Sequence, residues 1–181
     1  IAIKSYFKNE IKTIHVQNPK ISSKYFDLLL IPEHDRITGK NIIQTKGGLS
    51  FFLNHEIDNK KKLPPPKPII FLMVGGNNKR YNPQNFDYYD LGMKAVHATK
   101  ALNAKLIIST SRRTGKKAEK VMKSIFTKQL NDFELYTFKD KNPYPKILET
   151  ADFIIVTSDS VNMVSETATI STPLFVSYFK K

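Results

Sequence analysis

The sequence predicts an α/β protein with two Rossmann-like lobes, and three observations support this fold class. Short apolar runs alternate with amphipathic stretches of helical period, which is the pattern of parallel strands joined by crossover helices. A segment rich in lysine and proline, residues 59–67, interrupts that alternation and predicts a stiff linker. The chain has 181 residues, 40% of them hydrophobic, which is enough to bury a core in each of two small lobes.

Three strands are predicted before the linker. Residues 11–17 alternate apolar and polar side chains, and the unbroken apolar run at 26–32 is typical of a strand that is covered on both faces. Residues 41–45 supply the third strand. We therefore interpret residues 1–58 as the C-terminal part of a first Rossmann-like lobe.

Beyond the linker, residues 68–181 predict most of a second Rossmann-like lobe. Five strands are expected, at 69–74, 105–110, 133–138, 152–157 and 173–178. The stretches between them carry apolar stripes of helical period, which we assign to the core, and the alternation predicts a mostly parallel sheet. Because the chain starts without methionine and stops directly after an apolar run, we expect a fragment that lacks both ends.

Composition narrows the classes of function. The absence of cysteine excludes disulfides, thiolate nucleophiles and cysteine metal sites, and no apolar run approaches the eighteen or so residues of a membrane span, so we expect a cytoplasmic protein. The 29 Lys+Arg against 16 Asp+Glu give a net charge of +13, which fits either a polyanionic partner or a general bias toward lysine, asparagine and isoleucine. Nucleic acid is the least favoured partner, because no aromatic platform is interleaved with the basic residues.

Ligands of doubly wound sheets bind beyond the carboxyl ends of the strands, so the loops after the strands are the candidate binding segments. After the first strand of the second lobe come Gly75, Gly76 and Asn77. Paired glycines let a backbone approach an anion closely, and they equally form a simple tight turn.

The loop after the next strand contains Ser111, Arg112 and Arg113 and leads into a helix. Hydroxyl and guanidinium groups at a helix start suit a diphosphate. A capped helix with two solvated arginines is the alternative interpretation of the same residues.

The third candidate segment follows the fourth strand of the second lobe and runs into a helix; its candidate residues are Ser158, Asp159, Ser160 and Glu166. We expect a buried stripe of Val161, Val164 and Ala168, with a polar face made by Asp159, Asn162 and Glu166. Asp159 or Ser160 fits an N-cap as well as a ligand contact. Glu166 lies more than one turn inside the helix, so it is either a solvated glutamate or an acceptor for ligand hydroxyls.

In the first lobe, ionisable side chains gather at a strand end, where Glu33, His34 and Asp35 follow one another. A histidine between carboxylates suits a general base, which makes His34 and Asp35 the candidate catalytic residues. A structural turn is the alternative with equal weight.

Four segments together resemble the mitochondrial-fission "elongated mitochondria" (ELM) family, which is common in alphaproteobacteria and also found in plants. They are Pro32-Glu33-His34-Asp35, Gly75-Gly76-Asn77, Thr110-Ser111-Arg112-Arg113-Thr114 and the run from Thr157 to Glu166, and their order and spacing match from Val16 to Val176. Before the last strand, where relatives commonly have Gly-Lys-Pro, this chain has Ser171-Thr172-Pro173. The resemblance implies a GT-B-like pair of Rossmann lobes, in a family that is glycosyltransferase-like.

The resemblance also implies a ligand. In GT-B glycosyltransferases a glutamate inside the helix after the fourth strand of the donor lobe accepts hydrogen bonds from the ribose, and Glu166 matches that place. The leading hypothesis is metal-independent transfer of a sugar from a nucleotide-sugar donor, with no prosthetic group, Arg112, Arg113 and the glycine loop on the diphosphate, and His34 as base. The alternative is a non-catalytic two-lobed scaffold that binds a protein or associates peripherally with a membrane surface.

Overall fold

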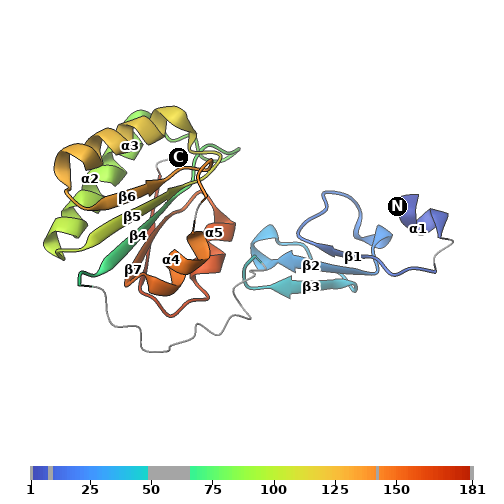
Figure 1. The fold of residues 1–181 in the computed structure, drawn as a ribbon. Helices are drawn as coiled ribbons and strands as arrows, with labels where there is room; N and C mark the ends of the chain where they lie inside the picture. Colours follow the sequence, from blue (N-terminus) through green and yellow to red (C-terminus); the bar gives the residue numbers. More distant parts are fainter. Residues whose placement is uncertain (1, 8–9, 49–65, 142, 180–181) are drawn as a thin grey trace. The chain divides into compact units, whose positions relative to one another are not determined.

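The computed structural model describes residues 2–7, 10–48, 66–141 and 143–179, which belong to two compact units, Ile1–Ser50 and Phe51–Lys181. Each unit has its own parallel sheet (Figure 1). Most of the predicted linker at 59–67 lies outside the described residues, so its conformation stays a prediction.

The first unit contains the three predicted strands, each shorter than expected. β1 (Ile14–Val16), β2 (Leu28–Pro32) and β3 (Ile42–Thr45) pair in parallel in the order β1-β2-β3. One short helix, α1 (Ala2–Tyr6), and two 3-10 turns, η1 (Ser23–Tyr25) and η2 (Glu33–Asp35), complete its described elements. The central strand carries the core, since Leu29 and Ile31 are fully buried.

A carboxylate fastens the chain ahead of β1 to the start of β2. Asp27 accepts hydrogen bonds from the Lys4 ammonium at 2.8 Å and from the amide and hydroxyl of Thr13 at 2.7 and 2.9 Å. These donors, led by Lys4, hold the pKa of Asp27 far below its ordinary value of 3.8. A carboxyl with a depressed pKa in the folded state stabilises the fold fully above that ordinary value, and this contribution is lost as the pH falls through the folded-state pKa.

We therefore expect the Asp27 carboxyl to stay ionised at pH 3, which a pH titration of its carboxyl carbon by NMR can measure. Removing the ammonium with Lys4→Met should move the titration midpoint back toward 3.8, because the largest cause of the shift is gone. A wild-type midpoint at or above 3.8 would contradict the hydrogen-bond pattern described here.

The second unit is a doubly wound sheet of five parallel strands, which confirms the predicted fold class. The strands are β4 (Ile69–Val74), β5 (Lys105–Thr110), β6 (Phe133–Tyr136), β7 (Phe153–Thr157) and β8 (Leu174–Ser177), in the spatial order β6-β5-β4-β7-β8. The helices between them are α2 (Asn85–Ala101), α3 (Gly115–Gln129), α4 (Tyr144–Thr150) and α5 (Val161–Thr167). None of the helices in the described ranges is both long and apolar enough to cross a membrane.

Both faces of this sheet are covered, and β4 shows why its sequence is apolar throughout. Ile70, Leu72 and Val74 pack into one core together with α2 and α3, whereas Phe71 and Met73 pack into a second core with α4. Successive side chains of a strand point to opposite faces, so a strand between two helical layers has no position for a polar residue. Figure 1 shows α2 and α3 on one side of the sheet and α4 and α5 on the other.

The predicted buried stripe of α5 is confirmed for Val164 and wrong for Val161 and Ala168. Val161 is 46% exposed and Ala168 is the exposed C-cap, whereas Thr167 is fully buried and Met163 and Val164 pack against the second core. The reason is the helix length: with only seven residues, α5 turns the line through 163, 164 and 167 toward the sheet, and it ends before Ala168.

Candidate functional site

The strand order places the carboxyl ends of β4 and β7 side by side, although 82 residues separate Gly75 from Thr157, which accepts its amide hydrogen bond. Crossovers leave this pair in opposite directions, toward β5 and β6 on one side and toward β8 on the other. Such a topological switch point is where open α/β sheets bind ligands. The loops after β4, β5 and β7 meet there.

Asp159 holds the three loops together from inside. Its side chain is completely buried, and one oxygen, Oδ2, accepts the Gly76 amide at 2.9 Å and contacts Nη2 of Arg113 at 2.9 Å. The other oxygen, Oδ1, accepts the Thr157 hydroxyl at 2.7 Å. The prediction that Asp159 lies on a polar helix face beside Glu166 is therefore wrong, because the loop before α5 turns this carboxylate inward toward the glycine loop.

Further hydrogen bonds fasten the β4 loop to the β7 loop. The Gly75 amide donates to the Thr157 hydroxyl at 2.7 Å, and the Asn78 side-chain amide donates to the Asp159 carbonyl at 2.8 Å. Asn78 also accepts the amides of Arg80 and Tyr81 through its side-chain oxygen. The conformation of the loop is therefore stabilised by its own protein contacts.

The paired glycines are required by this packing. A Cβ at Gly75 would lie 2.2 Å from both carboxylate oxygens of Asp159, and a Cβ at Gly76 would lie 2.1 Å from the Arg113 carbonyl oxygen. Both residues are buried. Their lack of a side chain thus serves the close approach of three loops, and an anion contact at their amides stays a prediction.

The β5 loop is a turn closed by its own hydroxyls. Thr114 donates to the carbonyls of Val74 and Gly75 and accepts the Ser111 amide at 3.0 Å. The Ser111 hydroxyl in turn accepts the Arg113 amide at 3.2 Å. Ser111 and Thr114 therefore fix where the two arginines project.

The two arginines differ in what they already bind. Arg113 contacts Asp159 and donates to the Gly76 carbonyl at 3.2 Å, so much of its guanidinium serves the loop cluster. Arg112 is exposed and has no hydrogen-bond or ion-pair partner among the described residues. Of the predicted pair, Arg112 is the one whose guanidinium is available to a ligand.

Neither candidate N-cap before α5 makes a capping hydrogen bond. Ser160 occupies the N-cap position without a side-chain cap, and the Asp159 carboxylate is engaged in the loop cluster. The Ser158 hydroxyl is buried and has no hydrogen-bond partner in the described part of the chain. A buried hydroxyl without a hydrogen-bond partner costs free energy.

Glu166 is half-buried, and a long-range contact holds it in place. The Tyr144 hydroxyl of α4 donates to Oε2 of Glu166 at 2.7 Å, and the Tyr144 ring packs edge-on against Phe71 with ring centroids 6.0 Å apart. Burial and this hydrogen bond raise the pKa of Tyr144 far above its ordinary value, so its hydroxyl stays protonated and donating. Glu166 is therefore not the fully solvated glutamate that was one of its two interpretations, and its partner Tyr144 lies 22 residues away in sequence.

The predicted site residues do not all converge. Gly75, Gly76, Arg113 and Asp159 form one cluster, whereas in the described ranges no hydrogen bond or ion pair joins Glu166 to any of them. Glu166 belongs to the α4 and α5 face of the sheet and the α3 start belongs to the opposite face. The loop cluster and Glu166 therefore both lie near the carboxyl edge of the sheet, but Glu166 and the α3 start lie on opposite faces of it.

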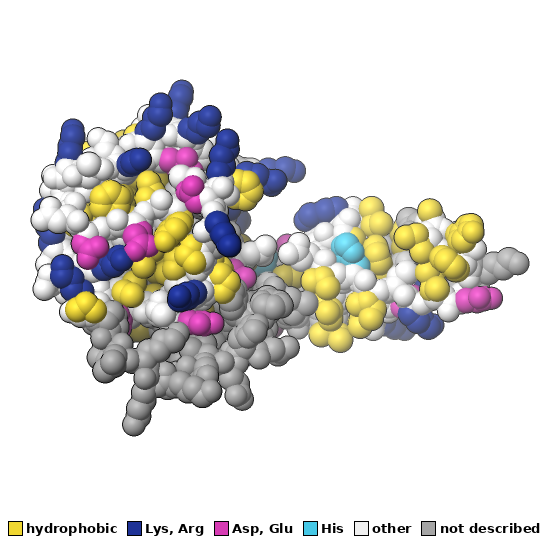
Figure 2. Space-filling view, in the orientation of Figure 1, with side chains coloured by type: hydrophobic (Ala, Val, Ile, Leu, Met, Phe, Trp, Pro, Cys, Tyr) yellow, Lys and Arg dark blue, Asp and Glu magenta, His cyan; other side chains and the backbone are white. Residues whose placement is uncertain are grey.

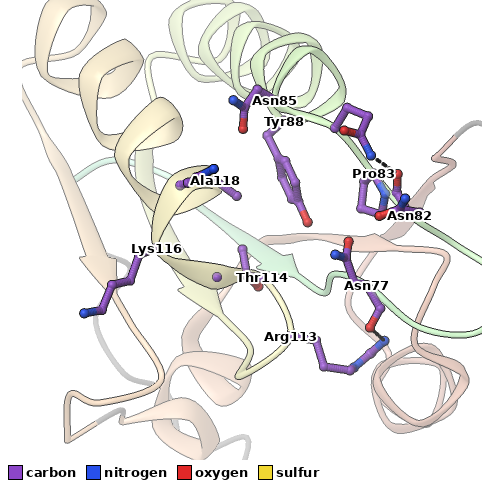
Figure 3. Close-up of a pocket in the computed structure, with 12 residues that line it drawn as sticks. Asn77, Asn82, Pro83, Asn85, Tyr88, Arg113, Thr114, Lys116 and Ala118 are labelled. Carbon is purple, nitrogen blue, oxygen red and sulfur yellow. Dashed lines mark hydrogen bonds between the residues drawn. The ribbon is translucent and has the colours of Figure 1, made fainter.

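A pocket of about 420 Å³ lies at the start of α3, next to the segment predicted to suit a diphosphate, and sequence reasoning missed the part of it that α2 supplies (Figure 3). Asn77 and Arg113 line it, together with Lys116 and Lys117 of α3 and with Tyr88 of α2. Tyr88 lies on the same apolar helix face as Leu91 and Ala95, so its sequence context indicates a core residue only. Its hydroxyl, buried without a partner, distinguishes it in the structure.

The candidate catalytic residues of the first unit lie in η2. His34 is exposed and Asp35 is half-buried, and neither side chain has a hydrogen-bond or ion-pair partner within the described residues. In those same residues, no group of three or more His, Asp or Glu side chains is placed to hold a metal ion.

The protein has two units, each with a parallel sheet, and the loops of the second unit meet at a topological switch point. This is a GT-B-like α/β fold. A similar solved structure is UDP-GlcNAc 2-epimerase from Neisseria meningitidis bound to UDP-GlcNAc, with a TM-score of 0.56 and 13% identity over 88% of this chain and 46% of that one. MurG from Acinetobacter baumannii matches with a TM-score of 0.39 and 12% identity over 90% of this chain and 43% of that one.

The family follows from the sequence. The model of the mitochondrial fission ELM1 family matches residues 1–181, and the chain belongs to this family. A curated relative, uncharacterized protein RP120 of Rickettsia prowazekii (strain Madrid E), is 26% identical over 97% of the chain. The chain spans 60% of the length of that relative.

Proposed function

We propose that the second unit binds a nucleotide-sugar and that the protein is a metal-independent glycosyltransferase with an acceptor still to be identified. The observation that carries the proposal is Glu166, a half-buried carboxylate inside the helix that follows the fourth strand of a GT-B-like second unit. GT-B glycosyltransferases use a glutamate at this place to accept the ribose hydroxyls. The similar epimerase structure, which contains UDP-GlcNAc, supports the choice of ligand class.

The contacts of Glu166 suit that role. Tyr144 occupies Oε2, whereas Oε1 receives no hydrogen bond from the described residues, so one oxygen is fixed and the other is available. A carboxylate that is already oriented loses little side-chain entropy when a ligand binds. Tyr144 is in this account a positioning residue that acts through Glu166.

The remaining roles follow from charge and position. The ligand would have to cross the carboxyl edge of the sheet, which the loop after β5 and the start of α5 share. There Arg112 and the Ser158 hydroxyl, neither of which has a partner among the described residues, are proposed to contact the diphosphate, while Arg113 holds the loops that carry them. Cations and backbone dipoles stabilise the diphosphate as it leaves with the electron pair of the broken sugar–oxygen bond. His34, next to Asp35, is proposed to take the proton of the attacking acceptor hydroxyl.

One observation favours a second candidate function. The described part of the first unit exposes several large apolar side chains, among them Ile3, Tyr6, Ile14 and Ile43, each more than 50% exposed. Exposed apolar groups of this kind suit a non-catalytic scaffold that binds a protein or associates with a membrane surface. For either function we propose a cytoplasmic location.

The first experiment is a thermal-shift screen of the intact protein against nucleoside diphosphates and their sugars, with UDP and UDP-GlcNAc included. A ligand that binds only the folded state raises the melting temperature, by an amount that grows with its concentration over Kd. A screen in which no nucleotide changes the melting temperature would favour the scaffold.

Removing the Glu166 charge should weaken nucleotide-sugar binding without unfolding the protein. Glu166→Gln keeps an oxygen for the Tyr144 hydroxyl, so we expect near wild-type stability and a roughly tenfold loss of affinity in titration calorimetry. Glu166→Ala should lose about ten- to a hundredfold and also cost about 1–3 kcal/mol of stability, because the Tyr144 hydroxyl loses its acceptor. Equal affinities of wild type and Glu166→Gln would remove the ribose assignment.

Tyr144→Phe is the matched variant for the positioning role. It frees the Glu166 carboxylate to rotate and should weaken nucleotide-sugar binding by a few-fold, less than Glu166→Ala does. If Tyr144→Phe alone abolished binding, the tyrosine would be a direct ligand contact.

A further inference from the structure

The pocket at the start of α3 is basic and contains no acidic lining residue. It lies where the loop after β4 and the first turn of α2 face the N-terminal end of α3 (Figure 3). Three of its lining residues are cationic, Arg113, Lys116 and Lys117, and the acidic side chains of the neighbourhood are absent from the lining. A volume of about 420 Å³ is in the range of pockets that take small molecules.

A single hydroxyl points into this pocket without a hydrogen-bond partner. Tyr88 is only 3% exposed, and its ring is held in the core by an edge-on contact with Phe179, with ring centroids 5.4 Å apart. Figure 3 shows the ring directed from α2 toward the space beside Asn77 and Thr114. The hydroxyl is buried and unpartnered among the described residues, although buried hydroxyls in folded proteins are nearly always hydrogen-bonded.

Tyr88 is suited to donate to an anion. Burial, assisted by the charge of Asp159, raises the pKa of Tyr88 to about 12, so the hydroxyl keeps its proton at neutral pH. A ligand oxygen in the pocket would accept a hydrogen bond from the Tyr88 hydroxyl, which would then no longer be unsatisfied.

The two long helices that border the pocket end differently. α2 is closed by a capping box, in which Asp87 accepts the Gln84 amide at 2.7 Å and the Gln84 side chain accepts an amide of the first turn. α3, 15 residues long, has no side-chain cap and no acidic residue in its first turn. The first turn of α3 lines the pocket, so its free amides and positive dipole end lie beside it, whereas Figure 3 shows the Lys116 side chain directed away from Tyr88.

We propose that this pocket binds a phosphoryl group, with one phosphoryl oxygen accepting a hydrogen bond from Tyr88 and the negative charge stabilised by the amides and positive dipole end of α3. The site lies on the α2 and α3 face of the sheet, whereas Glu166 lies with α4 and α5. It adjoins the β5 loop of the proposed nucleotide-sugar site but depends on Tyr88 and the α3 start, which that proposal does not use. The phosphoryl group can come from a separate phosphomonoester or from the end of a nucleoside diphosphate.

The test is titration calorimetry of the intact protein with inorganic phosphate at low salt, for wild type, Tyr88→Phe and the matched control Tyr89→Phe. Tyr89 is the next residue and is 55% exposed, so its hydroxyl serves as the reference for loss of a surface tyrosine group. We expect Tyr88→Phe to weaken phosphate binding by about tenfold or more, the effect of losing a hydrogen bond to a charged group, and Tyr89→Phe to leave it unchanged.

Melting curves without ligand separate this role from a structural one. Tyr88→Phe removes a buried hydroxyl that has no hydrogen-bond partner among the described residues. The melting temperature of this variant without phosphate should therefore equal or exceed that of wild type. A tyrosine with a structural hydrogen bond would behave in the opposite way. Phosphate binding that is equal in wild type and Tyr88→Phe, or that is not saturable in wild type, would overturn the proposal.

A competition arm identifies the source of the phosphoryl group. If UDP displaces phosphate from the wild-type protein, the pocket binds the end of a nucleoside diphosphate. If phosphate stays bound, the pocket binds a separate phosphorylated ligand. Both results support the phosphate site itself. Glu166→Gln should bind inorganic phosphate like wild type. A failure of nucleotide-sugar binding would therefore leave the phosphate result intact, so the two proposals fail separately.

Discussion

Asp159→Ala is expected to destabilise the second unit by about 2–5 kcal/mol, because two buried donors, the Gly76 amide and the Thr157 hydroxyl, lose their acceptor at about 1–3 kcal/mol each. The substitution removes the carboxylate from Arg113 and the acceptor from the Gly76 amide and the Thr157 hydroxyl, all of which are otherwise satisfied inside the loop cluster. In urea unfolding followed by far-UV circular dichroism, the midpoint should fall by roughly 1 M or more, given m values of about 1–3 kcal/mol/M.

A matched control separates this effect from simple loss of a charge. Asp90 forms an exposed i,i+4 pair with Lys94 at 2.7 Å, so Asp90→Ala should change stability by no more than about 0.5 kcal/mol. If Asp159→Ala unfolded at the urea concentration of wild type and lost only nucleotide affinity, Asp159 would be a ligand contact rather than the residue that holds the loops.

Gly76→Ala should have an effect of similar size for a steric reason. The added Cβ would lie 2.1 Å from the Arg113 carbonyl oxygen and 2.5 Å from the Thr114 amide nitrogen, both backbone atoms that cannot turn aside. Relief of the clash requires the β4 and β5 loops to separate, which breaks the bond from the Gly76 amide to Asp159. We expect a loss of about 3 kcal/mol or more, at the upper end of overpacking effects.

Gly92→Ala provides the comparison, because Gly92 lies in the middle of α2. There the nearest atom to an added Cβ is the end of the Ile125 side chain at 3.1 Å, which can rotate, and alanine is the better helix former. Its unfolding free energy should stay within about 1 kcal/mol of wild type. Equal stabilities for Gly76→Ala and Gly92→Ala would show that the loops tolerate a side chain at 76.

The second sheet was predictable because its central strands are buried on both faces. An apolar run such as 69–74 needs a helical layer on each side, and the helical stripes between the runs supply those layers, so alternation alone indicated the parallel sheet. Strand ends were less predictable. β6 stops at Tyr136 rather than 138 because the Thr137 amide donates to the Asp140 side chain and turns the chain out of the sheet.

The sequence predicted which loops form the candidate site, but not which side chains contact one another there. The carboxyl-edge rule correctly brings the segments around Gly75, Arg113 and Asp159 together, but which way each side chain points depends on the strand order. Asp159 turns inward because Gly76 and Arg113 approach it from distant segments, and Glu166 is fixed by Tyr144 from another helix. Tyr88 carries no sequence signal, since only its missing partner distinguishes it from a core tyrosine.

Binding of a nucleotide-sugar at the carboxyl edge of the second sheet can be measured by hydrogen–deuterium exchange. Exchange of the intact protein is followed by mass spectrometry with and without saturating UDP-GlcNAc or the tightest nucleotide of the screen. We expect protection to increase in peptides covering 75–78, 111–117 and 157–167, because their amides belong to the three loops and to α5. Unchanged exchange in these peptides, or protection confined to the exposed apolar residues of the first unit, would contradict it.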